Sequence, residues 1–138
     1  MIRAVIDTNV FISGIFWKGP PYLILEAWSE GKFKLIISSE ILIEYERVLN
    51  ELSKKANAQN SHRIFDLIKL NAEMVTPVVF AKFVCRDKDD DKFLAAALGG
   101  SVQFLVTGDE DLLVLGEYHG LKILKPKLFL DQDLRAIK

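Results

Sequence analysis

Short apolar runs recur along the chain, and each one stops at a polar or turn-forming residue. Runs of this kind, rich in β-branched residues, are typical of strands buried on both faces of a parallel sheet. They predict strands at residues 2–6, 33–37, 104–106 and 121–124. A further run at residues 74–79 is broken by Pro77. Proline cannot donate to a sheet ladder, so this run predicts a strand near an edge.

Amphipathic stretches separate the apolar runs. They predict helices over residues 10–17, 21–28, a long segment capped by Ser38 or Ser39, residues 62–73 and residues 90–98. The polar residues 57–61 predict a turn between two of these helices. Strands that alternate with helices predict one three-layer α/β/α domain over residues 1–138, built on a doubly wound parallel sheet of about five strands. The strands at 2–6 and 104–106 are expected at its centre.

Composition and the lengths of the apolar runs fit one compact domain and argue against several other classes of protein. Half of the residues are hydrophobic, which is too many for a disordered chain. No apolar run approaches the roughly 18 residues that span a bilayer. The start lacks the design of a signal peptide, because its apolar stretch meets Asp7 at once. The single cysteine, Cys85, rules out an internal disulfide and suits the reducing cytoplasm, where we expect this protein.

Acidic residues follow the two strands that we expect at the centre of the sheet. Asp7 comes directly after the first, and Asp109 and Asp111 come just after the strand at 104–106. The carboxyl ends of parallel strands share one edge of the sheet, so these side chains should meet there. Carboxylates crowded together repel one another unless a divalent cation holds them. The alternative for Asp7 and for Asp109 is a cap on the next helix, where Asp is common.

Helical phase narrows the choice of acids on the segment that follows Ser39. An apolar arc on this segment consists of Ile41, Leu42, Tyr45, Val48, Leu49 and Leu52. Glu44 borders one side of the arc and Glu46 borders the other. Either glutamate reaches over the edge of the sheet, and periodicity alone does not decide between them.

The run of three aspartates at residues 89–91 opens the next helix. Acids in a first turn complement the helix dipole, which is the simplest reason for finding several there. Phase places Asp90 over the centre of the buried face and Asp91 on its flank, whereas Asp87 and Asp89 are expected to be solvated or capping. A calcium-binding loop is excluded, because Lys92 stands where that loop needs glycine.

Four motifs together resemble the PIN domain family, specifically its VapC-like toxin components of toxin–antitoxin pairs. They are DTNVFIS at 7–13, SSEILIEYERVL at 38–49, RDKDDDKFLAAAL at 86–98 and LVTGDEDLL at 105–113. They occur in the order found in the family and span nearly the whole chain. Each motif alone is weak evidence, and the four in order are a strong signal.

The resemblance implies a role for each acid. The principal, catalytic acids correspond to Asp7, Glu44, Asp90 and Asp109, with Asp91 taking the third place under a shift of one residue. Metal ligands are then expected among Asp7, Asp90, Asp91, Asp109 and the accessory acid Asp111. The polar residues expected to support these acids from behind are Asn9, Ser13 and Thr107.

The resemblance also implies an activity. It predicts an endoribonuclease that uses Mg²⁺ or Mn²⁺ to hydrolyse RNA and leaves a 5′-phosphate and a 3′-hydroxyl. Three lysines, Lys18, Lys88 and Lys92, lie near the acidic edge and are expected to contact the RNA backbone. The resemblance further predicts a homodimer and allows for a small antitoxin partner. Exposed Phe16, Trp17 and Tyr22 are the residues expected at the dimer contact.

Two other functions fit parts of the pattern. Asp7 after a first strand is also the place of the nucleophile in phosphatase-like, Mg²⁺-dependent phosphoryl hydrolases. Those enzymes usually need a second aspartate two residues later, and this chain has Asn9 there. A catalytically silent scaffold that only binds RNA or a protein partner is the other alternative. The acids at every principal position favour an enzyme over that scaffold.

Overall fold

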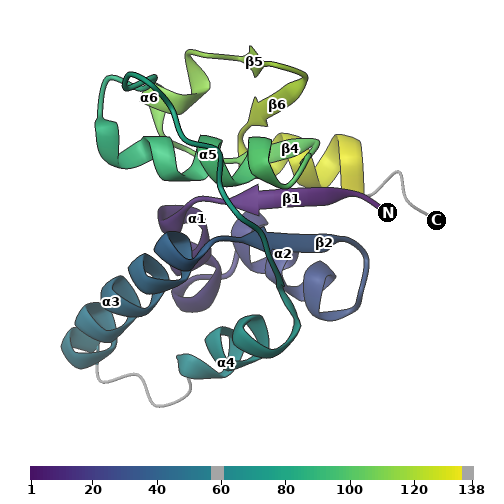
Figure 1. Ribbon diagram of the computed structural model, residues 1–138. Helices are drawn as coiled ribbons and strands as arrows, with labels where there is room; N and C mark the ends of the chain where they lie inside the picture. Colours follow the sequence, from purple (N-terminus) through teal and green to yellow (C-terminus); the bar gives the residue numbers. More distant parts are fainter. Residues whose placement is uncertain (57–60, 135–138) are drawn as a thin grey trace.

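The computed structural model describes residues 1–56 and 61–134 (Figure 1). Its centre is a sheet of strands in the order β3-β2-β1-β4-β6-β5. The strands are β1 (Arg3–Ile6), β2 (Lys34–Ile37), β3 (Glu73–Met74), β4 (Phe104–Val106), β5 (Glu117–Tyr118) and β6 (Leu121–Leu124). Every neighbouring pair is parallel except β5 with β6. The predicted doubly wound sheet is confirmed, with six strands in place of about five.

Helices cover both faces of the sheet and complete the three layers. They are α1 (Thr8–Phe16), α2 (Pro20–Ser29), α3 (Ser39–Ala56), α4 (His62–Asn71), α5 (Asp91–Gly99), α6 (Glu110–Leu113) and α7 (Pro126–Leu128). A 3₁₀ turn at Lys88–Asp90 leads into α5, and a π-helical turn at Phe129–Leu134 follows α7. Helix α5 packs on β1, β2 and β4, while α1 and α2 pack together on the other face (Figure 1).

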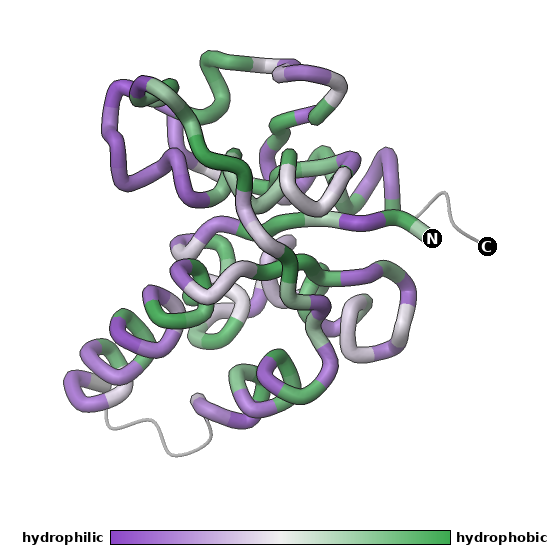
Figure 2. The backbone as a smooth tube through the Cα atoms, viewed as in Figure 1, coloured by the Kyte–Doolittle hydropathy of each residue, from purple (hydrophilic) through white to green (hydrophobic). Residues whose placement is uncertain are grey.

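The core is apolar because the strands turn hydrophobic residues to both layers of helices. Figure 2 shows hydrophobic colour along the central strands, whereas the turns of α3 alternate between hydrophobic and hydrophilic. Tyr45 of α3 is fully buried and stacks on Phe11 of α1, with ring centroids 4.2 Å apart. Its hydroxyl donates a hydrogen bond to the carbonyl oxygen of Ile6. This contact fixes α3 against the end of β1, next to Asp7.

The predicted helix at 62–73 is present but ends two residues early, and the strand expected within 74–79 lies earlier in the chain. Helix α4 ends at Asn71, and β3 occupies only Glu73–Met74. The strand stops early because Pro77 has no N–H, and because the N–H of Val78 turns to the carbonyl oxygen of Ala95 on α5 (3.0 Å). The edge position expected for this strand is confirmed. Most of the predicted turn at 57–61 lies outside the described residues.

The antiparallel strand β5 is absent from the sequence-based prediction. It forms a hairpin with β6, in which Tyr118 pairs with Leu121. The two residues between them, His119 and Gly120, both have positive φ, of 51° and 86°. Two successive positive φ values are the mark of a tight turn whose twist matches a hairpin. Within residues 1–56 and 61–134, no helix is both long and apolar enough to cross a membrane.

Candidate metal centre

The parallel pairing of β1 with β4 brings two of the predicted acids to the same edge. Ile6 is in register with Val106, so the residues that follow both strands leave the sheet side by side. The N–H of Asp7 donates to the carbonyl oxygen of Val106 at 3.0 Å. The carboxylate of Asp109 is close enough for its charge to raise the pKa of Asp7.

Asp7 caps a helix and faces the centre at the same time. Its Oδ1 accepts the N–H of Val10 in the first turn of α1 at 2.9 Å. Its Oδ2 accepts the hydroxyl of Thr107, which lies just after β4. Burial raises the pKa of Asp7 to about 6 although these two hydrogen bonds lower it, and the charges of Asp109 and Glu44 raise it further. Capping and proximity to the other acids are therefore not alternatives here.

Three carboxylates form the cluster at the middle of this edge. Ligand oxygens of Asp90, Asp109 and Asp111 all lie within 4.8 Å of one another. Asp109 caps α6 by accepting the N–H of Asp111 at 2.8 Å, which fixes the relative position of these two acids. Thr107 accepts the N–H of Asp109 at 2.9 Å and so ties the cluster to Asp7.

Asp90 shows that the cluster suits a cation. Its Oδ2 is buried and has no hydrogen-bond partner among the described residues. Burial, followed by the negative charge of Asp109, raises the pKa of Asp90 to about 7. A buried carboxylate oxygen without a donor is costly, and a hard divalent cation with oxygen ligands relieves that cost. The donor set of this chain therefore fits Mg²⁺ or Mn²⁺.

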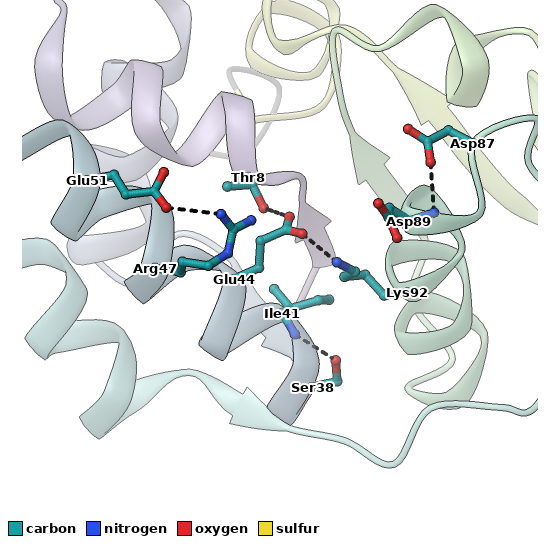
Figure 3. A network of polar contacts seen from close by, with 9 residues as sticks. All are labelled: Thr8, Ser38, Ile41, Glu44, Arg47, Glu51, Asp87, Asp89 and Lys92. Carbon is teal, nitrogen blue, oxygen red and sulfur yellow. Dashed lines mark hydrogen bonds and ion pairs between the residues drawn. The ribbon is translucent and has the colours of Figure 1, made fainter.

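Glu44 lies beside the cluster with both of its oxygens engaged. It accepts the hydroxyl of Thr8 on one oxygen and forms an ion pair with Lys92 of α5 on the other (Figure 3). The side chains of Glu44 and Lys92 are each only 18% exposed. Glu46 of the same helix is exposed. Of the two glutamates that periodicity left open, Glu44 is thus the one near Asp7.

Asp91 has a different position from its neighbour Asp90. Its two carboxylate oxygens accept the backbone N–H groups of Val84 at 2.9 Å and Cys85 at 2.7 Å. Burial raises the pKa of Asp91, but these hydrogen bonds outweigh it and the net pKa lies below the ordinary value. The carboxylate of Asp91 therefore holds the loop that precedes α5 and is not one of the three clustered acids.

The lysines expected to contact RNA, and the polar residues expected to support the acids, differ in exposure and in their partners. Lys92 is paired with Glu44, and the ammonium of Lys88 lies 5.8 Å from the centre of the Phe83 ring. Lys18 is exposed between α1 and α2, and Asn9 is exposed in the first turn of α1. Ser13 is half-buried on α1, one turn further from the acids.

Two polar residues at the centre were missing from the sequence-based set. Thr8 holds Glu44, and its signal was available, since it directly follows Asp7 and is polar in an apolar helix. Arg86 places its Nη2 atom 2.8 Å from Oδ1 of Asp111. Its only signal was its position at the start of the motif at 86–98, which does not specify a partner.

Comparisons with known proteins identify the family and support the fold. A sequence profile described as "PIN domain" matches residues 3–111. The uncharacterized protein MJ1680 of Methanocaldococcus jannaschii is 32% identical over 143 residues, which cover 95% of this chain and 91% of that protein. The crystal structure of VapBC2 from Rickettsia felis, bound to a DNA fragment from their promoter, contains a chain of similar fold. Its TM-score is 0.56 at 15% identity, over 88% of this chain and 97% of that one. By the span of the profile and the identity to this relative, the chain belongs to the PIN domain family.

Proposed function

We propose that this protein is a metal-dependent endoribonuclease, which hydrolyses phosphodiester bonds of RNA at the centre formed by Asp7, Glu44, Asp90 and Asp109. The observation that carries the proposal is the cluster of Asp90, Asp109 and Asp111, with a buried oxygen of Asp90 that has no donor in the described part of the chain. Membership of a family whose members are generally nucleases supports it.

Asp90, Asp109 and Asp111 would hold the metal, with Asp7 beside them. Asp91 is left out of this set, because both of its oxygens already accept backbone N–H groups. When bound there, Mg²⁺ or Mn²⁺ would supply an activated water and neutralise charge on the phosphate. A cation next to Asp90, whose pKa is about 7, would favour its ionised form at neutral pH.

The other residues of the centre hold these acids in place. Thr107 fixes both Asp7 and Asp109, so the two strands present their acids in a constant relation. Thr8 and Lys92 restrain Glu44, which would orient the attacking water. Side chains fixed in this way need little reorganisation during the reaction, which is a general source of catalytic efficiency.

A toxin–antitoxin role is the finer part of the proposal. The solved structure with a similar fold is named as a VapBC2 assembly on promoter DNA, which supports an antitoxin partner for this chain as well. We also propose a homodimer, which the family resemblance implies. The half-buried Phe16 and Tyr22 and the exposed Trp17 provide apolar surface for a symmetric contact.

The test is cleavage of a single-stranded RNA by purified protein in Mg²⁺ or Mn²⁺, with EDTA as the metal-free reference. Asp7→Asn and Glu44→Gln should each lower the rate at least about a hundredfold, as removal of a group acting in the transition state commonly does. Glu46→Gln is the matched control, because Glu46 is exposed on the same helix, and it should cleave like the wild type.

The products distinguish this reaction from other routes of RNA cleavage. Hydrolysis at a metal centre should leave a 5′-phosphate and a 3′-hydroxyl, which end-labelling detects. Cleavage that persists in Asp7→Asn would show that the activity does not belong to this centre. RNA that binds without any cleavage in either metal would favour the silent scaffold instead.

A further inference from the structure

Arg86 is a cation at the mouth of the acid cluster. Its guanidinium contacts Asp111 at 2.8 Å, and among the ion pairs of residues 1–56 and 61–134 this is the one that includes a member of the cluster. The two partners differ in accessibility. The side chain of Arg86 is 87% exposed, whereas that of Asp111 is 21% exposed. The guanidinium therefore lies mostly in solvent while it contacts a largely shielded acid.

The backbone just before Arg86 is held in place, although the side chain of Arg86 lies mostly in solvent. The two residues before it, Val84 and Cys85, donate their N–H groups to the buried carboxylate of Asp91. Cys85 is itself buried. The arginine thus extends from an anchored position towards the cluster, and its long side chain is free to change partner.

Because the side chain of Arg86 is largely in solvent, its ion pair with Asp111 contributes little to stability and is easily exchanged. A phosphodiester offers two anionic oxygens in the geometry that a guanidinium binds with two parallel hydrogen bonds. We propose that Arg86 is the phosphate-binding residue of this centre, which leaves Asp111 to contact a backbone phosphate of RNA. The inference rests on the proposed function and assigns to the substrate a residue outside the acid set.

Loss of Arg86 should change the affinity for the metal cation and the affinity for RNA in opposite directions. The guanidinium repels a metal cation and competes with it for Asp111, so removing it should strengthen metal binding. The same change removes an attractive contact to RNA, so it should weaken substrate binding. Loss of a residue that merely held the loop in place would not strengthen metal binding while it weakened RNA binding.

The experiment compares Arg86→Ala, Arg86→Lys and the control Arg47→Ala with the wild type. Arg47 is a matched control, because it also pairs with an acid, Glu51, at 3.3 Å, and lies on α3 in an exposed pair (Figure 3). Mn²⁺ affinity is measured by calorimetry on the full chain without RNA. KM and kcat are measured on a labelled single-stranded oligoribonucleotide in saturating Mg²⁺, and melting temperatures check that each variant is folded.

For Arg86→Ala we expect Mn²⁺ to bind roughly two- to fivefold more tightly, the range for an exposed pair. KM should rise roughly tenfold or more, as for loss of a hydrogen bond to a charged group. Arg86→Lys should keep the wild-type Mn²⁺ affinity and show an intermediate KM. A lysine retains the positive charge but cannot form the two parallel hydrogen bonds of a guanidinium. Arg47→Ala should change neither quantity.

Two results would overturn the inference while the proposed function stands. One is an active Arg86→Ala variant whose KM stays within about twofold of the wild type; the other is weaker binding of Mn²⁺ to that variant. If the wild type itself cleaves no RNA, the proposed function fails. The role of Arg86 is then tested by RNA affinity, measured by fluorescence anisotropy in Mg²⁺. Equal affinities of wild type and Arg86→Ala would then overturn the inference separately.

Discussion

Asp7 combines two properties that the sequence presents as alternatives. It caps α1 through Val10, and it also lies against Thr107, with Glu44 and Asp109 near enough to affect its pKa. Its pKa of about 6, against an ordinary 3.8, means that ionisation is less favourable in the folded chain than in the unfolded one. The folded protein therefore gives up stability in order to keep this acid at the edge of the sheet.

The first prediction concerns pH. Well below pH 3.8, Asp7 is protonated in both states; between about pH 3 and pH 7 the unfolded chain loses the proton more readily than the folded one, which favours unfolding. The free energy of unfolding of the metal-free wild type, relative to Asp7→Asn, should thus fall by roughly 3 kcal/mol as pH rises through this window. Urea unfolding in EDTA from about pH 3 to pH 8 measures this change. A difference that grows with rising pH would contradict the assignment.

The second prediction compares two adjacent acids. Asp90→Asn should leave the metal-free protein equally or more stable, because it removes a repelling charge from the cluster. It should also reduce the rise in melting temperature that Mg²⁺ or Mn²⁺ causes, and reduce RNA cleavage. Asp89→Asn is the control, because Asp89 is exposed and outside the cluster. Loss of activity in Asp89→Asn but not in Asp90→Asn would reverse the assignment.

At the scale of elements, the long and strongly patterned segments were predictable and the shortest were not. Helix α5 and the strands β1 and β4 follow from apolar runs with clear ends. Strands β3 and β5 each have two residues, which is too short for any alternation to appear. Their positions depend on contacts from distant parts of the chain, such as the N–H of Val75 donating to the carbonyl oxygen of Ile37.

The third prediction tests how the segment after β3 packs on α5. A Cβ atom at Gly99 would lie 2.1 Å from the carbonyl oxygen of Thr76 and 3.0 Å from Cα of Pro77. Gly99→Ala should therefore displace that segment and destabilise the fold by about 1–3 kcal/mol, as overpacking generally does. Chemical unfolding measures the change. Gly19→Ala serves as control, because no atom lies within 4 Å of its added Cβ. Equal stability of the two variants would show that the segment after β3 can move without destabilising the fold.

At the scale of the whole molecule, the centre is assembled from four segments far apart in the chain. The rule that parallel strands share an edge indicated where Asp7 and Asp109 would meet. Helical phase expected Asp90 over the centre of the buried face, but Asp91 is the more buried of the two and Asp90 lies in the turn before α5. The pairs Lys92 with Glu44 and Arg86 with Asp111 could not be predicted. Topology places the backbone of each residue, but the direction of a long charged side chain depends on which partner is nearest in three dimensions.

The fourth prediction concerns assembly. Trp17 is 64% exposed at the end of α1, where a large apolar side chain in solvent favours a partner surface. Light scattering should give twice the 15.6 kDa of one chain at micromolar concentration. Trp17→Ala should shift the mass towards the monomer, whereas Leu128→Ala, exposed in α7, should not. A mass near 15.6 kDa at every concentration would exclude the dimer.

The two ends of the sheet bear on how this protein avoids aggregation. The outermost strands β3 and β5 have two residues each, and Pro77 follows β3 closely. An incoming strand would find few unpaired backbone groups on either side, which is how natural sheets prevent edge-to-edge growth. A partner of this molecule would therefore have to recognise side chains on its helices and loops, and a mutation that lengthens either edge would be expected to promote insoluble association.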